Sequence, residues 1–495
     1  MLLFMVQIVY SEDVIIEIPD FDVRVNGVLI DTEHSQYPLI SYKNVTYFPM
    51  TSDYLTGIGL DLSFTSKEGL KLSLSDNLGQ LEQKFLGANN ILGSKDTARL
   101  VPFQVRVNGQ TIDNSKEAYP VLLYKDITYF PMTWRFAVTE FGWTTSWSNE
   151  KGFAITIENK NEGISRLSDT VTINNKVIQY SGLKVDLDKG FKIQSALAHD
   201  KIGSTDSLEN MAVENNALIA VNGSYFAAYF KDDTPKDPYG ILVLDGELAH
   251  NGNGRATLGI KDGQVDIDRV DATIRGESAS PSLNWTWVAY WMNHTTSENG
   301  VTFTIFDKFR GSDTMNFYGK NHVIEDGVVT QVSDNQIVDI PENGYVVNLN
   351  GQLGANMTQV YECFEVGNTF SFEYELTPDN EDQKDFWNNL DYATGAGPAL
   401  LLDGFIDIDF ESEGFYEPKI LENTAARSAI GYTKDNELII VTTTATIYEL
   451  ANIMRRLGCY EAMNLDGGAS SGLWYKGNYI RKPGRDLSNM IYITK

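Results

Sequence analysis

The sequence predicts an α+β protein: a small β-rich repeat region, followed by a larger domain with a large mixed β-sheet and flanking helices. Three observations support this prediction. A chain of 495 residues exceeds the usual size of one domain. Its first third contains an internal repeat. The remainder mixes short apolar strands, such as 219–221 and 438–441, with helical stretches at 207–214 and 448–457.

The first segment, residues 1–21, opens with an apolar stretch at 1–10 that has no basic start region. We interpret it as the remnant of a signal peptide, with a first β-strand as the alternative. No stretch reaches the ~18 apolar residues that a membrane helix needs, so we expect no transmembrane segment. An extracellular or cell-surface location follows as an expectation.

Residues 22–158 contain two copies of one pattern. Residues 23–27 recur at 105–109 and residues 42–51 recur at 124–133, both at an offset of 82, and one inserted residue then aligns Gly69 with Gly152. Each copy carries an Asn-Gly turn signal between strand-like runs, which predicts two small β-rich modules. A polar linker is expected at residues 159–169, with the main domain at 170–495.

The two copies resemble the stalk modules of exported bacterial proteins known as copper-amine-oxidase-like N-terminal domains. The resemblance implies a spacer or wall-binding module, and a folded support for the downstream domain is the alternative. It implies no copper site here, because copper needs imidazole or thiolate ligands and this region has only His34 and no cysteine.

The charge balance limits the classes of partner. Lys and Arg number 39 against 67 Asp and Glu, a net charge of −28. Such a chain is a poor binder of nucleic acid and of anionic membranes. Any anionic substrate must therefore meet local cations. The two cysteines, Cys363 and Cys459, either form one bridge or remain two buried thiols.

The domain at 170–495 contains four polar elbows beside apolar strands, at residues 222–224, 395–404, 426–432 and 464–471. In the last of these, Gly467 and Gly468 permit a turn that other residues resist. The turn brings together the carboxylate of Asp466 and the hydroxyls of Ser470 and Ser471, beside free backbone N–H groups. Such an arrangement suits an oxyanion, and an Asp that only caps its own turn is the alternative.

This ordered set of motifs resembles the phosphodiester glycosidase family over roughly the last two-thirds of the chain. The resemblance implies hydrolysis of a sugar-1-phosphodiester, such as an N-acetylglucosamine-1-phosphodiester, at the anomeric bond, with release of sugar and phosphomonoester. A phosphate leaving group is already a stable anion, so cations and N–H groups replace much of the usual acid catalysis. No cofactor and no metal are expected.

Three residues form the expected catalytic set. Arg427 binds phosphate through its planar fork, with a structural salt bridge as the alternative. Asp466 acts as a base for water or as the nucleophile. Asn222 holds sugar hydroxyls through its amide, or the Asn222-Gly223 pair is only a turn. The expected substrate-binding residues are Gly223, Gly397, Gly467, Gly468, Ser470 and Ser471.

Some side chains are assigned no catalytic role. Histidines are absent from the four elbows, and we expect His250 and His294 to be surface or core residues. The acidic run at 407–413 lacks the central glycine of an EF-hand loop and is interpreted as a strand with a solvated face. The aromatic residues at 285, 287, 290 and 291 form either the rim of a polymer site or part of the core.

The expected partner is a sugar-1-phosphodiester or phosphate-containing glycan, with a cell-wall polymer as a further candidate and no nucleic acid. The alternative function is a non-catalytic carbohydrate-binding or cell-wall-binding surface protein with the same fold. The presence of Asp466, Arg427 and Asn222 together favours the enzyme, because a binding protein would be expected to have lost at least one of them.

Overall fold

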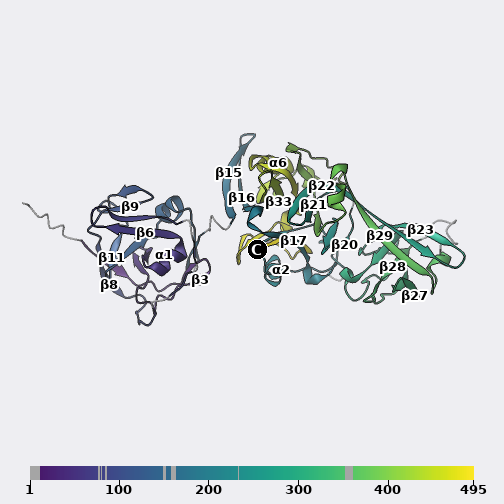
Figure 1. Cartoon of the computed structure of the whole chain (residues 1–495), viewed down its shortest axis with the longest axis horizontal. Helices are drawn as coiled ribbons and strands as arrows, with labels where there is room; N and C mark the ends of the chain where they lie inside the picture. Colours follow the sequence, from purple (N-terminus) through teal and green to yellow (C-terminus); the bar gives the residue numbers. More distant parts are fainter. Residues whose placement is uncertain are drawn as a thin grey trace, which may run out of the picture. The chain divides into compact units, whose positions relative to one another are not determined.

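The computed structural model describes residues 12–75, 78–79, 81–83, 86–148, 152–157, 163–231, 234–252, 254–351 and 361–495. The chain forms two compact units, Met1–Ile164 and Ser165–Lys495 (Figure 1). Strands account for 48% of the described residues and helices for 13%, a strand-rich composition consistent with an α+β or mostly-β fold. The apolar start at 1–10 lies outside the described residues. The expected linker at 159–169 lies partly outside them, and its last residues belong to strand β15 (Ile164–Ile173).

The first unit is built around a closed barrel of six strands taken from both copies of the repeat. The barrel order is β1 (Asp13–Glu17), β4 (Ile40–Tyr42), β5 (Val45–Pro49), β12 (Ile127–Pro131), β11 (Leu122–Tyr124) and β8 (Lys95–Leu100). In β5 and β12, Phe48 pairs directly with Phe130, and these residues are 82 positions apart in sequence. The two copies are therefore related by a local two-fold axis that passes between these two phenylalanines.

Each copy also completes a sheet of the other copy. Strand β2 (Val23–Val25) pairs in parallel with β14 (Gly152–Thr156), and β9 (Val105–Val107) pairs in parallel with β7 (Gly69–Leu74). The prediction of two small modules is therefore wrong in one respect: the copies interlock in a single unit. The physical reason is that neither copy has enough strands to close a barrel around a core of its own.

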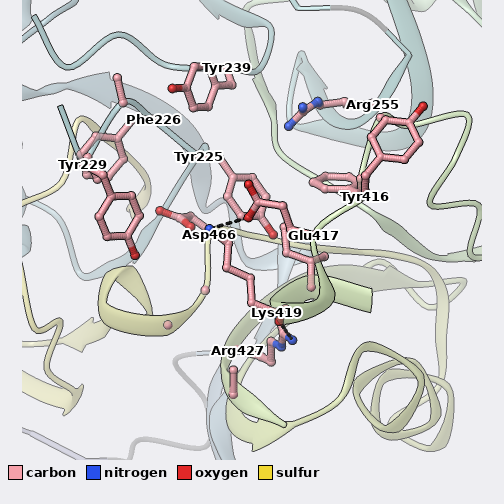
Figure 2. Close-up of a pocket in the computed structure, with 18 of the residues that line it drawn as sticks. Tyr225, Phe226, Tyr229, Tyr239, Arg255, Tyr416, Glu417, Lys419, Arg427 and Asp466 are labelled. Atoms are coloured by element: carbon pink, nitrogen blue, oxygen red, sulfur yellow. Dashed lines mark hydrogen bonds and ion pairs between the residues drawn. The ribbon is translucent and has the colours of Figure 1, made fainter. Parts of the chain in front are cut away.

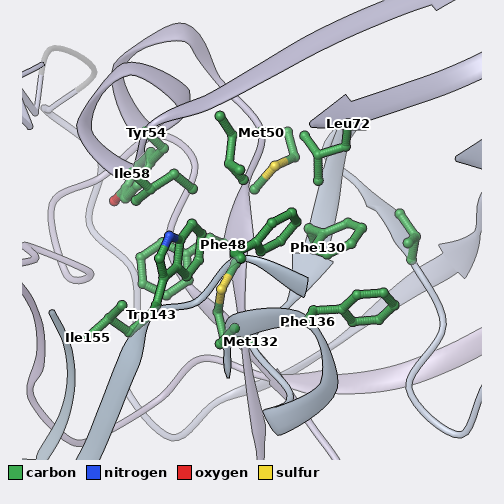
Figure 3. Close-up of a cluster of buried hydrophobic side chains, with 14 of the residues drawn as sticks. Phe48, Met50, Tyr54, Ile58, Leu72, Phe130, Met132, Phe136, Trp143 and Ile155 are labelled. Carbon is green, nitrogen blue, oxygen red and sulfur yellow. The ribbon is translucent and has the colours of Figure 1, made fainter. Parts of the chain in front are cut away.

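The shared core contains Phe48, Phe130 and Phe136, all almost fully buried (Figure 3). The two aligned glycines stand where the copies meet. A Cβ on Gly69 would lie 2.0 Å from the carbonyl oxygen of Gln104, and one on Gly152 would lie 2.0 Å from that of Asp22. Both glycines also have positive φ, +74° and +69°. Close approach and backbone conformation both require glycine at these two positions.

The second unit contains three sheets. The seven-stranded sheet has the order β15, β16 (Lys176–Asp186), β34 (Glu437–Ala445), β33 (Ala425–Thr433), β35 (Cys459–Asn464), β31 (Ala399–Leu402) and β32 (Phe405–Ile406). The five-stranded sheet has the order β17 (Lys192–Leu197), β38 (Asn489–Thr494), β18 (Ile219–Asn222), β36 (Leu473–Tyr475) and β37 (Asn478–Arg481).

The third sheet is the largest, with twelve strands. Its order is β20 (Glu247–His250), β19 (Leu242–Leu244), β30 (Tyr392–Gly395), β21 (Arg255–Lys261), β22 (Gln264–Ala279), β29 (Thr369–Pro378), β27 (Val328–Asp334), β26 (Lys320–Glu325), β28 (Gly344–Asn350), β25 (Thr302–Phe306) and β24 (Trp291–Met292), with β23 (Asn284–Ala289) paired to β22. Among its described pairings only β24 with β25 is parallel. The expected mixed sheet is thus almost wholly antiparallel, because hairpins and loops connect its strands rather than helical crossovers.

Two helices that the sequence predicts are present in this unit. Helix α2 (Leu208–Glu214) begins after the N-cap Ser207, whose hydroxyl accepts from the backbone N–H of Asn210. Helix α6 (Ile447–Arg456) starts with a capping box between Thr446 and Glu449, and its apolar side is buried on the seven-stranded sheet. The predicted strands 219–221 and 438–441 lie within β18 and β34.

The structure also bears on the expectations for the acidic run, the two cysteines and the membrane-spanning segment. The acidic run at 407–413 is a turn and not a strand, because its last residue, Glu413, is buried and paired with Arg269 at 3.0 Å. Cys363 and Cys459 are both buried and unpaired. None of the helices in the described part of the chain is both long and apolar enough to cross a membrane.

Candidate active site

A cavity of about 540 Å³ lies in the second unit and is lined in part by two of the four polar elbows, those at 426–432 and 464–471 (Figure 2). Strand β35 ends at Asn464, and the turn after it places Asp466, Gly467 and Gly468 in the cavity wall. Arg427, near the start of β33, lines the same cavity. Two of the three expected catalytic residues, Asp466 and Arg427, are therefore brought together although they are far apart in sequence.

The carboxylate of Asp466 is only partly exposed to the cavity. Burial raises the pKa of Asp466 to about 6. Hydrogen bonds from the Ser470 hydroxyl and the Gly467 N–H oppose this rise, as do the positive charges of Arg485 and Lys419. Asp466 is thus a carboxylate that is ionised at neutral pH and more basic than an ordinary aspartate.

The guanidinium of Arg427 is fixed by backbone carbonyls. Its Nε donates to the carbonyl of Ala445 at 3.3 Å, and its Nη2 donates to those of Lys419 and Asn423 at 2.9 Å each. No carboxylate pairs with Arg427 among the residues that the structure describes. A structural salt bridge is therefore not its role, and its positive charge remains available to the cavity.

Three further cations line the cavity, and the sequence did not single them out: Arg255, Lys419 and Arg485. Arg255 begins β21, lies 4.7 Å from the ring centroid of Phe415 and has no ion-pair partner among the described residues. The Asn-Gly pair that precedes Arg255 in the sequence was a signal that could have identified it. Lys419 and Arg485 carry no such signal.

Lys419 lies on the short helix α5 (Pro418–Leu421), and its Nζ contacts a carboxylate oxygen of Glu417 at 2.6 Å. Figure 2 shows this ammonium group between Glu417 and Asp466. In total the cavity lining contains four cations and two carboxylates. This balance is the reverse of that of the whole chain, which has 39 basic and 67 acidic residues.

Aromatic side chains form much of the remaining wall: Tyr225, Phe226, Tyr229, Phe230, Tyr239, Phe415 and Tyr416. Tyr225 follows the elbow after β18, and its hydroxyl accepts a hydrogen bond from the amide of Asn464 at 2.9 Å. Its pKa is raised by burial and by the nearby Asp466. Tyr225 is thus a neutral hydroxyl next to the carboxylate, a placement that the sequence did not predict.

Asn222 does not line the cavity, which corrects its expected role in holding the sugar. Its side chain is 1% exposed, and its amide forms hydrogen bonds with the backbone around the turn that contains Asp466. The Nδ2 group donates to the carbonyl of Asp466 at 2.7 Å, and Oδ1 accepts from the N–H of Gly472 at 3.0 Å. Asn222 therefore positions the turn, and its amide is buried outside the cavity lining.

Four expected substrate-binding residues also lie behind the wall and not in it: Gly223, Gly397, Ser470 and Ser471. A Cβ on Gly223 would lie 2.0 Å from Oδ1 of Asn489, so this glycine permits close packing of two loops. The carbonyl of Gly397 accepts from Asn464 at 2.9 Å. Ser471 shares a hydrogen bond of 2.8 Å with Ser428, and Ser470 reaches the site only through Asp466.

The histidines and the tryptophan-rich segment lie outside the cavity lining. His250 is fully buried and shares a hydrogen bond of 3.2 Å with His294. Trp287 is a core residue stacked on Phe370 at 4.7 Å. Of the aromatic residues at 285, 287, 290 and 291, none lines the cavity described here.

Comparisons with known proteins relate this chain to one family. Residues 318–494 match the family model of phosphodiester glycosidases. No curated protein matches the chain. Asp466, Arg427, Lys419 and Arg485 lie inside the matched segment, whereas Arg255 precedes it.

Two solved structures share the fold, and a third is less similar. A hypothetical protein from Synechocystis is 16% identical, with a TM-score of 0.59 over 95% of this chain and 98% of that chain. A proposed exported protein from Burkholderia pseudomallei K96243 is 19% identical, with a TM-score of 0.53 over 64% of this chain and 74% of that one. The catalytic domain of zebrafish N-acetylglucosamine-1-phosphodiester alpha-N-acetylglucosaminidase is 15% identical, with a TM-score of 0.35 over 67% and 83% of the two chains.

Proposed function

We propose that the protein is a glycosidase that hydrolyses sugar-1-phosphodiesters at the anomeric C–O bond and releases the sugar and a phosphomonoester. The observation that carries the proposal is the cavity lining, which gathers four cations and only two carboxylates in a chain of net charge −28. A cationic cavity in so acidic a protein is suited to an anionic ligand. The family-model match supports the same class of reaction.

The proposed reaction needs one group that accepts a proton from water or bonds to the sugar, and several groups that stabilise the negative charge of the phosphate. Water adds to the anomeric carbon while the C–O bond to phosphate breaks, and the carboxylate of Asp466 accepts the proton of that water. In the alternative route Asp466 attacks the anomeric carbon itself and water later releases the sugar. In both routes the bonding electrons leave with the phosphate oxygen, so the phosphomonoester departs as a stable anion.

The cations stabilise that departing charge. Arg427 and Arg255 offer planar donor groups that match phosphate oxygens. Both are held in place before the substrate arrives, Arg427 by three backbone carbonyls and Arg255 by the ring of Phe415. Such fixed charges lower the barrier without reorganisation during the reaction. The aromatic walls provide apolar surface for the faces of the sugar ring.

The finer assignments also belong to the proposal. The sugar is N-acetylglucosamine-like, the physiological substrate is a phosphate-containing glycan such as a cell-wall polymer, and the protein acts outside the cell. The first unit is its stalk, comparable to the modules that its repeat resembles. These assignments rest on the resemblance of the motifs rather than on the geometry of the cavity.

The test is hydrolysis of N-acetylglucosamine-1-(methyl phosphate) in water enriched in ¹⁸O. Wild type should place the label in the sugar, because the C–O bond breaks; label in the phosphate would mean a phosphodiesterase instead. Asp466→Asn should lower kcat by at least ~10²-fold. Arg427→Ala should lower kcat and raise KM, while the exposed arginine variant Arg275→Ala should behave like wild type.

Binding of the diester without turnover by wild type would overturn the proposal. It would support the alternative, a carbohydrate-binding surface protein with the same cavity. Equal rates for wild type and Asp466→Asn would remove Asp466 from the mechanism while leaving the reaction class in place. Isothermal titration with the same diester measures the binding in either case.

A further inference from the structure

The first unit carries two aromatic pairs, and each pair joins a ring packed against the core, Phe21 or Phe103, to an exposed ring. Phe64, in β6 (Leu60–Thr65), meets Phe103 edge to face with 5.0 Å between ring centroids. Trp147, in β13 (Thr144–Ser148), meets Phe21 in the same manner at 4.8 Å. Phe64 is 53% exposed and Trp147 is 56% exposed.

The two pairs are equivalent under the internal repeat. Phe21 and Phe103 are related by the offset of 82 residues, and Phe64 and Trp147 by 83, the offset that also relates Gly69 to Gly152. An exposed aromatic residue thus stands at the same place in both copies, although it is phenylalanine in one and tryptophan in the other. The duplicated feature is the aromatic face and not a particular residue.

The strand register shows to which side of its sheet each of the two exposed rings points. Phe64 pairs with Leu70, and Trp147 pairs with Phe153, so each ring points to the side of its sheet that carries the core. Both rings nevertheless remain more than half exposed. An aromatic side chain has 150–250 Å² of surface, so each ring leaves on the order of 100 Å² uncovered.

That area determines the kind of partner. A stable protein interface needs ~800 Å² on each side, several times what one ring pair offers. One uncovered aromatic ring matches the face of a single sugar. The residues next in sequence to Phe21 and Phe103 are polar: Asp22 pairs with Arg24 at 2.9 Å in one copy, and Arg106 donates to Gln104 at 3.3 Å in the other.

We propose that the first unit binds a polysaccharide at two equivalent sites, one at the Phe21–Trp147 pair and one at the Phe64–Phe103 pair. A polymer of repeating sugars presents the same ligand many times, and two copies of one site in a single folded unit can engage it together. Simultaneous engagement raises the apparent affinity without any new contact. The proposal does not depend on the activity of the second unit.

The test is co-sedimentation of the full-length protein with insoluble chitin, a β-1,4-linked N-acetylglucosamine polymer, and with cellulose. Wild type should bind at least one of the two. Phe64→Leu and Trp147→Leu keep an apolar side chain for packing and remove the ring. Each should weaken binding by roughly 10²-fold, because either change removes the two-site engagement. The double variant should not sediment with the polymer.

Two controls separate binding from folding and from catalysis. Trp134 is 72% exposed, and the equivalent position in the other copy is Ser52, so Trp134→Leu should bind like wild type. Asp466→Asn should also bind like wild type. Melting temperatures of the ring variants should stay near that of wild type. Failure of wild type to bind either polymer, normal binding by the double variant, or an equal loss in Trp134→Leu would each overturn the proposal.

Discussion

Replacing Asp466 by asparagine should inactivate the protein and at the same time stabilise its second unit at neutral pH. The carboxylate is ionised in a place where burial disfavours its charge, and its pKa is raised to about 6 for that reason. Asparagine keeps the shape and the hydrogen bonding to Ser470 but carries no charge. Function and stability therefore make opposite demands on this side chain, as is common at active sites.

The size of the effect follows from the shift. The pKa moves from 3.8 to about 6, and each unit is worth ~1.36 kcal/mol, so the wild-type penalty approaches about 3 kcal/mol as a ceiling. Because the folded pKa lies above the unfolded one, the folded state binds the proton more tightly. The penalty is absent below pH 3.8, grows as the pH rises through about 6, and is complete above that pH.

Scanning calorimetry at pH 5 and pH 7.5 measures this difference. The melting temperature of the second unit in Asp466→Asn should exceed that of wild type by several degrees at pH 7.5 and by less at pH 5. Asp326→Asn is the matched control, because Asp326 is exposed in a turn of positive φ that asparagine tolerates. A lower melting temperature of the variant at both pH values, or a difference independent of pH, would refute the reasoning.

Two further substitutions test how the elbows and the interlocked repeats are held. Asn222→Ala leaves the buried carbonyl of Asp466 and the N–H of Gly472 without their side-chain partner. The substitution should lower the free energy of unfolding, measured with denaturant, by roughly 2–4 kcal/mol, and it should also lower kcat. Full activity of this variant would show that the turn needs no such support. Gly152→Ala should destabilise the first unit by several kcal/mol, because its Cβ would lie 2.0 Å from the carbonyl of Asp22. Hydrolysis of a small diester should be unchanged in this variant. An unchanged melting temperature of the first unit would contradict the predicted destabilisation.

The sequence predicted the local elements well because local rules decide them. The helical stretches expected at 207–214 and 448–457 correspond to α2 and α6, whose starts are fixed locally by the N-cap Ser207 and by the capping box at Thr446. The Asn-Gly turns of the repeat predict its hairpins. The interlocking of the two copies was missed, because the parallel pairing between β2 and β14 joins residues far apart in sequence and no local pattern specifies it.

The candidate site was predicted in part for a similar reason. Motifs identify which residues sit at strand ends, and this is enough to place Asp466 and Arg427 in one cavity. They do not give side-chain direction, so Asn222 was assigned to the substrate although its amide faces the neighbouring backbone. Lys419, on the short helix α5, and Arg485 were missed because an isolated basic residue carries no sequence pattern.

The charge distribution connects the site to the rest of the molecule. The net charge of −28 repels large polyanions, whose many phosphates must approach the whole surface together. A single phosphodiester inside a cavity of about 540 Å³ instead meets four cations at short range. Charges on the outer surface are screened over ~8 Å at physiological salt, whereas interactions inside a partly buried cavity are screened much less. An acidic surface and a cationic cavity together therefore favour a ligand with few charges over a polyanion, so the proposed activity should be directed at isolated diester linkages.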